Sequence, residues 1–257
     1  MPRLQLWYVP LTKFIRVAGL LTALLIATAT LSAQDAPATP PHGLDLYAVE
    51  IPARDRYALG RELLGVDVAP GTVVPSGPFA VGDRKTFFVT DSGTSRILEV
   101  EAELRGLGES IYVWVDVGAR VNNADIDALV SAFDGRIYPK VRALWGSEAS
   151  PGIDGDPRVH TLFTSQISPG LLGYFSSDNT YPPELVTASN AHEMFFMNAS
   201  ALGGVGTLRD VESTLAHEFQ HMIRSNLNAN SDTWLNEGLS MFTQIYMGYA
   251  DSLFYAN

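Results

Sequence analysis

The order of apolar and polar positions along the chain predicts an α+β fold. Five short apolar runs bounded by turn-forming residues have the length of strands. They cover residues 86–90, 97–104, 111–116, 159–164 and 191–198. Between the third and fourth runs, Asn122-Asn123 can cap a helix whose apolar residues recur at helical spacing towards Trp145. We expect Pro139 to break or kink that helix. Residues 166–190 are rich in Gly, Ser, Pro and Asn and predict a long surface loop.

Two more helices are predicted towards residue 257. Thr207 is followed three residues later by Asp210, which fits a capping box and places a helix start directly after Thr207. The turn-prone residues 226–231 then lead to a second helix with its cap at Ser231 or Asp232. The apolar stripe of this second helix is expected at Leu235, Leu239, Phe242 and Tyr246. Because the connection is short, the second helix should pack against the first.

The first 33 residues predict a secretory signal peptide. Arg3, Lys13 and Arg16 give a positive start, and residues 17–31 follow without a charge. This apolar run is short for a membrane span, so we expect cleavage and a secreted, extracellular protein. An uncleaved membrane anchor is the alternative, whereas a lipoprotein anchor is excluded because no cysteine follows the run.

The rest of the chain is expected to divide into three segments. Residues 34–43 are rich in Pro and Ala and predict a linker. Residues 44–104 predict a small β-rich N-terminal unit of unknown purpose, and residues 105–257 predict the main domain. The carboxylates that alternate along residues 99–103 are expected to form a solvated strand face rather than a metal site.

Charge and cysteine content narrow the possible partners and sites. The formal net charge is −11, and loss of three basic residues with the signal peptide would make it −14. Such an acidic protein is a poor partner for nucleic acid or for an anionic membrane. The chain has no cysteine, so it is not a disulfide scaffold, and any zinc site must use His, Asp or Glu.

The sequence TLAHEFQHMI carries the candidate chemistry. His217 and His221 stand four residues apart, so both project from one side of the predicted helix and can reach one zinc ion. Glu218 lies beside His217 and can act on water at that ion. A third ligand is needed. In the longer pattern HExxHxxGxxH it is the last histidine. That pattern is excluded here, because Arg224 stands at the glycine position and Leu227 at the position of the last histidine.

Glu237 is the remaining candidate for the third ligand. It falls one turn inside the second predicted helix, in the sequence TWLNEGLS. If that helix packs back on the first, Glu237 comes opposite the two histidines. The alternative for the same residues is a pair of buried structural histidines and a solvent-facing glutamate.

HEFQH followed by WLNEGLS resembles the gluzincins, the thermolysin-like zinc metallopeptidases whose third ligand is a glutamate. Within them it is most similar to the hyicolysin-type secreted neutral metallopeptidases, over residues 207–243. The resemblance implies a zincin-like upper lobe and a zinc-dependent endopeptidase that acts on protein or peptide substrates. It also implies that His217, His221 and Glu237 hold Zn²⁺ and that Glu218 is the catalytic general base.

Two features depart from that family. Met241 stands where thermolysin-like enzymes have an acidic residue that supports a histidine ligand. Gluzincins place an oxyanion-stabilising Tyr or His in a helical lower lobe, which we expect to be truncated because the sequence stops at Asn257. Tyr246 and Tyr249 lie too close on the same predicted helix to take that role.

Two other functions stay open at this point. One is a binding or structural protein that uses zinc for stability and has lost catalysis. The other is a zinc aminopeptidase, which needs acidic residues to hold the substrate amine, and Glu193 is the acidic residue near the site.

The remaining histidines and carboxylates of the main domain are expected to be structural. His160 should be a packed or edge histidine, and Asp154 and Asp156 should belong to a plain turn rather than a calcium loop. His192 with Glu193 copies the start of the motif without its second histidine. The strand at residues 191–198 is expected to be the edge on which an extended substrate adds.

Overall fold

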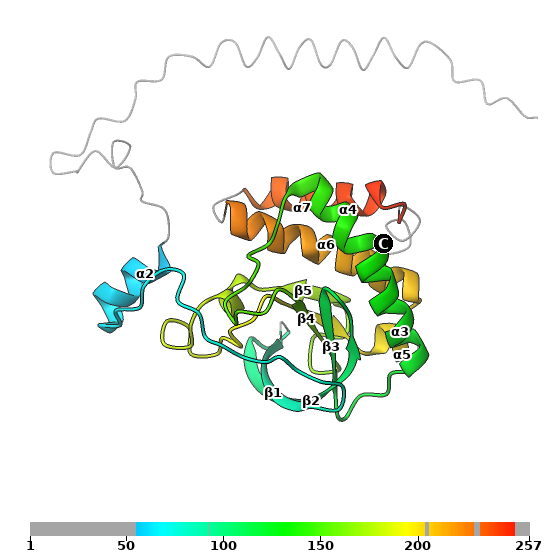
Figure 1. Cartoon of the computed structure of the whole chain (residues 1–257), viewed down its shortest axis with the longest axis horizontal. Coiled ribbons are helices and arrows are strands. Elements are labelled where there is room, and N and C mark those ends of the chain that lie inside the picture. Colours follow the sequence, from blue (N-terminus) through cyan, green and yellow to red (C-terminus); the bar gives the residue numbers. More distant parts are fainter. Residues whose placement is uncertain (1–54, 92, 204–205, 229–231, 250–257) are drawn as a thin grey trace, which may run out of the picture. The chain divides into compact units, whose positions relative to one another are not determined.

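The computed structural model describes residues 55–91, 93–203, 206–228 and 232–249. The predicted signal peptide, the linker and the beginning of the N-terminal unit lie outside these residues. The described residues form one mixed sheet with helices packed on it (Figure 1), which confirms the predicted α+β class. No helix among them is long and apolar enough to cross a membrane.

The sheet has six strands in the order β1-β2-β3-β4-β6-β5. The strands are β1 (Arg84–Asp91), β2 (Arg96–Leu107), β3 (Ile111–Asp116), β4 (Val159–Thr164), β5 (Gly173–Phe175) and β6 (Met194–Asn198). Neighbours β3, β4 and β6 are parallel, and the other neighbours are antiparallel. All five predicted strands are therefore present, and β5 is an addition from the segment that was expected to be loop.

The first two strands belong to the same sheet as the later ones. Ala102 of β2 pairs with Asp116 of β3, and β2 continues to Leu107. The boundary expected near residue 105 therefore falls inside a strand. Glu101 of β2 is exposed and lies 3.5 Å from the guanidinium of Arg84, so this strand face is solvated, as predicted.

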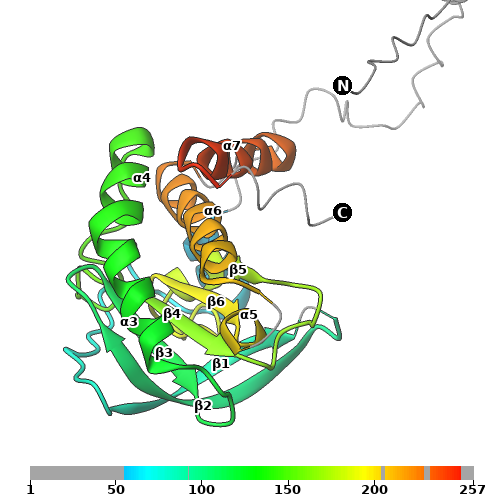
Figure 2. The same cartoon turned by 90° about the vertical axis from the view of Figure 1, so that its right-hand side faces the viewer.

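Both faces of the central strands are buried. All six residues of β3 are buried because its alternate side chains enter two different hydrophobic cores. Val113 and Val115 pack with the helices on one face. Tyr112 and Trp114 point to the other face, which the curled strands β1 and β2 cover (Figure 2).

Four longer helical segments lie on one side of the sheet, and the last of them packs on the third rather than on the strands (Figure 2). They are α3 (Asn123–Ala132), α4 (Tyr138–Trp145), α6 (Leu208–Leu227) and α7 (Thr233–Tyr246). A π-helical turn at Phe133–Ile137 joins α3 to α4. The shorter elements are α2 (Arg56–Leu59) with a following π-helical turn (Gly60–Leu64), a 3-10 turn (Ser177–Thr180) and α5 (Ser200–Gly203).

Local sequence signals set the helix starts as predicted. The side chain of Asn122 accepts a hydrogen bond from the backbone N–H of Ala124 and so caps α3. Pro139 lies in the first turn of α4, directly after the π-helical turn, where its missing N–H needs no helical partner. Thr207 and Asp210 exchange side-chain and backbone hydrogen bonds in the predicted capping box at the start of α6.

The predicted apolar stripe of α7 is wrong. Phe242 and Tyr246 are exposed, and the buried residues of this helix are Ser240, Thr243 and Gln244. The helix packs against α6 as expected, but it does so with polar side chains. The reason is that two of these side chains bind the histidines of α6, so hydrophobic periodicity points to the wrong face.

The predicted substrate edge is also wrong. The strand at residues 191–198 corresponds to β6, which lies between β4 and β5 and has no free side. The edge of the sheet at this end is β5 instead. The three residues of β5 were missed because their segment is dominated by turn-forming residues.

Candidate metal centre

α6 and α7 bring three predicted ligands together. The Nε2 atoms of His217 and His221 lie 3.1 Å apart. The carboxylate of Glu237 lies 3.4 Å from the first nitrogen and 3.5 Å from the second. Ligands about 2.0–2.1 Å from a tetrahedral ion are roughly 3.4 Å from one another, so this spacing fits zinc.

The orientation of the His217 ring is fixed by Gln244. The amide nitrogen of Gln244 donates to the hydroxyl of Ser213 at 2.9 Å, so its oxygen faces His217. That oxygen lies 3.1 Å from Nδ1 of His217. Because an amide oxygen only accepts, Nδ1 must carry the proton and Nε2 keeps its lone pair.

Ser240 does the same for His221. The hydroxyl of Ser240 donates to the side-chain oxygen of Gln220, and it lies 3.1 Å from Nδ1 and 3.4 Å from Nε2 of His221. With its single proton used on Gln220, the hydroxyl can only accept from His221, and Nδ1 is the nearer of the two ring nitrogens. A proton on Nδ1 leaves Nε2 of His221 bare, as in His217. Burial together with the neighbouring His217 lowers the pKa of His221.

Two bare nitrogens that face each other at 3.1 Å repel unless a cation lies between them. The two tautomers, the carboxylate of Glu237 and the distances all match the ligand set of a zinc ion with a remaining open position. A cavity of about 580 Å³ lies in front of them and is lined by all three residues. Neither Gln244 nor Ser240 was predicted, although Glu237, Ser240 and Gln244 share one face of α7 at helical spacing.

Glu218 lines the same cavity and is held by the edge strand. Its Oε2 accepts a hydrogen bond of 2.9 Å from the backbone N–H of Phe175 in β5. Burial raises the pKa of Glu218 to about 8, and the charge of Glu237 adds to that shift. A nearby dication would act in the opposite direction and favour the carboxylate.

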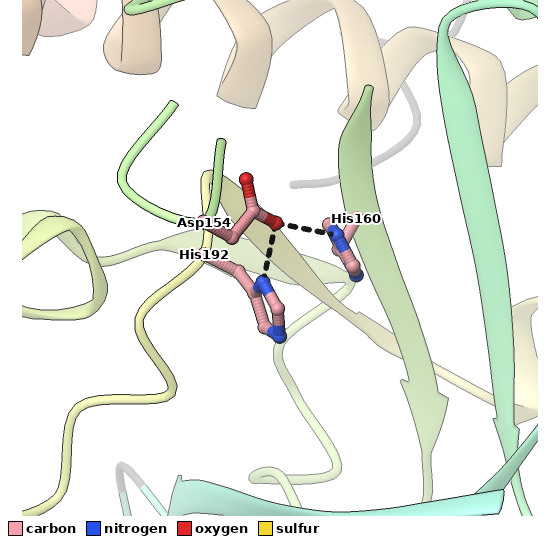
Figure 3. A group of neighbouring side chains, drawn as sticks. All are labelled: Asp154, His160 and His192. Atoms are coloured by element: carbon pink, nitrogen blue, oxygen red, sulfur yellow. Dashed lines mark hydrogen bonds and ion pairs between the residues drawn. The ribbon is translucent and has the colours of Figure 1, made fainter. Parts of the chain in front are cut away.

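A second cluster lies away from this centre and joins Asp154, His160 and His192 (Figure 3). Oδ2 of Asp154 is 3.1 Å from Nε2 of His160 and 2.6 Å from Nδ1 of His192. All three residues are buried, and the two imidazole rings stack with centroids 3.9 Å apart. Asp154 lies in the predicted turn, but its side chain belongs to a buried network. His192 is a member of that network as well.

Hydrogen bonding distinguishes this cluster from the first one. The indole N–H of Trp114 donates to Nδ1 of His160 at 3.1 Å. Nδ1 of His160 therefore has no proton, and Nε2 must carry one and donate it to Asp154. A metal ion at that Nε2 would require an imidazolate, so the three residues form a hydrogen-bonded network. Hydrogen bonds from the two histidines outweigh burial and lower the pKa of Asp154 well below its usual value.

The two tyrosines considered for oxyanion stabilisation lie elsewhere. Tyr249 is fully buried, and its hydroxyl donates to Glu212 at 3.0 Å. Tyr246 lies on the exposed side of α7. Neither lines the cavity in front of the three ligands.

Comparison with known proteins gives one distant relationship. No family model matches the chain. The chain is 25% identical over 178 residues to the neutral metalloprotease ShpI of Staphylococcus hyicus, an alignment that covers 64% of this chain and 40% of that protein. The chain therefore spans well under half of the relative's length. This similarity supports a metallopeptidase relationship.

Proposed function

We propose that this chain contains the zinc-binding part of a secreted zinc-dependent endopeptidase of the gluzincin type, close to the hyicolysin-type enzymes. The observation that carries the proposal is the close approach of the Nε2 atoms of His217 and His221 to each other and to the carboxylate of Glu237. The distant similarity to a neutral metalloprotease supports it. The uncharged run at residues 17–31 supports export.

His217, His221 and Glu237 would hold the ion, which would supply Lewis acidity for a peptide carbonyl and acidity for water. Glu218 would accept a proton from the attacking water at its free carboxylate oxygen and pass it to the leaving amine. The N–H of Phe175 holds the other oxygen of Glu218 and so orients the carboxylate. This division of roles makes Glu218 the general base and leaves Glu237 as a ligand only.

The edge strand β5 would position the substrate. β5 ends the sheet beside the cavity, and Gly173, Tyr174 and Phe175 all line that cavity. An extended peptide can add to such an edge through backbone hydrogen bonds. This arrangement favours cleavage within a chain, because backbone pairing extends on both sides of the scissile bond.

Peptidase assays on the zinc-loaded chain and its Glu218→Gln variant test the proposal. We expect hydrolysis of an internal bond in blocked peptides, its loss with chelator, and a decrease of about 10²–10⁴-fold in kcat for the variant. The variant should retain its zinc, since Glu218 is not a ligand. A folded, zinc-loaded parent that cleaves no peptide would favour the non-catalytic zinc protein, and cleavage of free amino termini alone would favour the aminopeptidase.

A further inference from the structure

A second cavity of about 360 Å³ lies next to the metal centre. Phe175 and Ser225 belong to the walls of both cavities. Phe175 is also the residue whose N–H holds Glu218. A group in the second cavity would therefore belong to a substrate residue close to the reacting bond.

Glu193 is the charged residue in the wall of this cavity. The other lining residues are neutral, and no basic side chain is among them. The carboxylate is buried, with 4% of the residue exposed, and Oε2 accepts a hydrogen bond of 3.0 Å from the N–H of Ile153. Burial raises the pKa of Glu193 to about 7, and the carboxylates of Asp154 and Glu148 contribute. A positive charge that enters the cavity would stabilise the ionised carboxylate of Glu193.

The surrounding loop holds Glu193 in place. Gly152 lies so close to the carboxylate that a Cβ at this position would come within 1.6 Å of Oε2. The next residues are Ile153, which binds Glu193, and Asp154, which binds His160 and His192 (Figure 3). Since His192 directly precedes Glu193, the buried network fixes both the loop and the start of β6. Glu193 therefore cannot easily turn away to another partner.

Aromatic side chains complete the cavity. Tyr57 and Tyr181 are part of its wall, with ring centroids 5.6 Å apart. The guanidinium of Arg56 already lies 5.3 Å from the ring centroid of Tyr181 and pairs with Asp178. Aromatic faces and a carboxylate are the groups that bind ammonium and guanidinium ions.

We propose that the cavity walled by Glu193, Tyr57 and Tyr181 binds a cationic nitrogen group of the peptide substrate. The proposal rests on the proposed peptidase function and adds a substrate class to it. A lysine or arginine side chain near the scissile bond and a free α-amine share this chemistry. Glu193 is then a specificity-determining residue. The pair His192-Glu193, which copies the start of the zinc motif, would thus take part in substrate recognition.

Binding measurements test the proposal without relying on turnover. The zinc-loaded Glu218→Gln variant is titrated calorimetrically with blocked peptides that carry lysine or norleucine at one position beside the scissile bond. We expect the lysine peptide to bind about 10-fold more tightly at pH 8, which corresponds to about 1.4 kcal/mol. A norleucine peptide with a free amino terminus shows whether the cation is instead the α-amine.

Glu193→Gln in the same background should reduce the difference between lysine and norleucine peptides to less than twofold. Glu101→Gln on the exposed face of β2 is the matched control and should leave it unchanged. If Glu193→Gln does not fold, the lysine preference of the single variant is measured from pH 8 to pH 5.5, where protonation of Glu193 should abolish it. Equal affinities, no binding of any peptide, or a preference that survives both treatments would overturn the proposal. Failure of catalysis alone leaves the binding result intact, so the two proposals are distinguishable.

Discussion

His217 and His221 direct their Nε2 atoms at each other across 3.1 Å. The oxygen of Gln244 holds the proton of His217 on Nδ1. The hydroxyl of Ser240 favours the same tautomer of His221, because it lies nearer to Nδ1 than to Nε2. The spacing of two histidines on a helix places the rings on one side. The polar face of α7 orients them as a pair of metal ligands would need.

Gln244→Leu should weaken zinc binding about 10–100-fold, since loss of the acceptor frees the His217 ring to change tautomer and orientation. Competition with a chromogenic chelator measures the affinity. Gln244→Glu, which keeps an acceptor oxygen at the same place, is the control and should restore most of the affinity. Equal affinities of the parent and the leucine variant would show that Gln244 does not orient the ligand.

Ser240→Ala should also lower zinc affinity, because it removes the acceptor for Nδ1–H of His221 and leaves the oxygen of Gln220 without its donor. The same competition assay applies. Ser240→Thr retains the hydroxyl and should stay close to the parent. A loss of affinity in the threonine variant as large as in the alanine variant would point to packing rather than to the hydroxyl.

Sequence patterns predicted the class of fold and the three candidate ligands that the structure brings together, but not the polar side chains that hold them. The capping box at Thr207 and the cap at Asn122 are local signals, and both were read correctly. The buried face of α7 was not, because Ser240 and Gln244 face α6 for hydrogen bonding whereas Phe242 and Tyr246 face outwards. Burial of apolar residues is the assumption behind any helical stripe, and it fails where a helix serves a polar site.

The buried network was missed for a different reason. Asp154, His160 and His192 come from a loop, from β4 and from the residues before β6. Only the parallel pairing of β4 with β6 brings them together, with His160 opposite Met194 in the register. Such a contact depends on tertiary structure, and no spacing along the chain marks it. The edge strand β5 was missed for the same reason. Its three residues form a strand because they pair with β6, not because their sequence has a high β propensity.

The buried network should make the protein sensitive to acid. Burial and the neighbouring His160 lower the pKa of His192 to about 3, from 6.5. The unfolded chain therefore binds a proton that the folded chain does not between pH 6.5 and pH 3. The free energy of unfolding is therefore highest above pH 6.5 as far as His192 is concerned. It falls as the pH decreases from 6.5 towards 3, by up to about 1.4 kcal/mol per pH unit.

Urea unfolding of the metal-free chain from pH 7 to pH 4 measures this slope. His192→Asn keeps an N–H donor near the position of Nδ1 but does not titrate, so its stability should depend less steeply on pH. The absence of any difference in slope between the parent and this variant would show that His192 does not titrate as described.

A substrate that adds to β5 should depend on its own backbone N–H groups. Ester-for-amide replacement along a cleaved peptide removes one N–H at a time. Replacements that face β5 should raise KM by about 2–10-fold, as expected for hydrogen bonds worth about 0.5–1.5 kcal/mol each. Esters at alternate positions, which point away from the edge, are the internal control. A flat KM along the series would contradict strand addition.

Zinc content of the purified chain is the most direct test of the metal centre. Elemental analysis should give about one zinc per parent chain, as expected for one site with three protein ligands. Glu237→Ala should contain clearly less, and Glu101→Gln, on the exposed face of β2, should match the parent. A folded parent without zinc, or full zinc content in Glu237→Ala, would contradict the account of His217, His221 and Glu237 as one metal site.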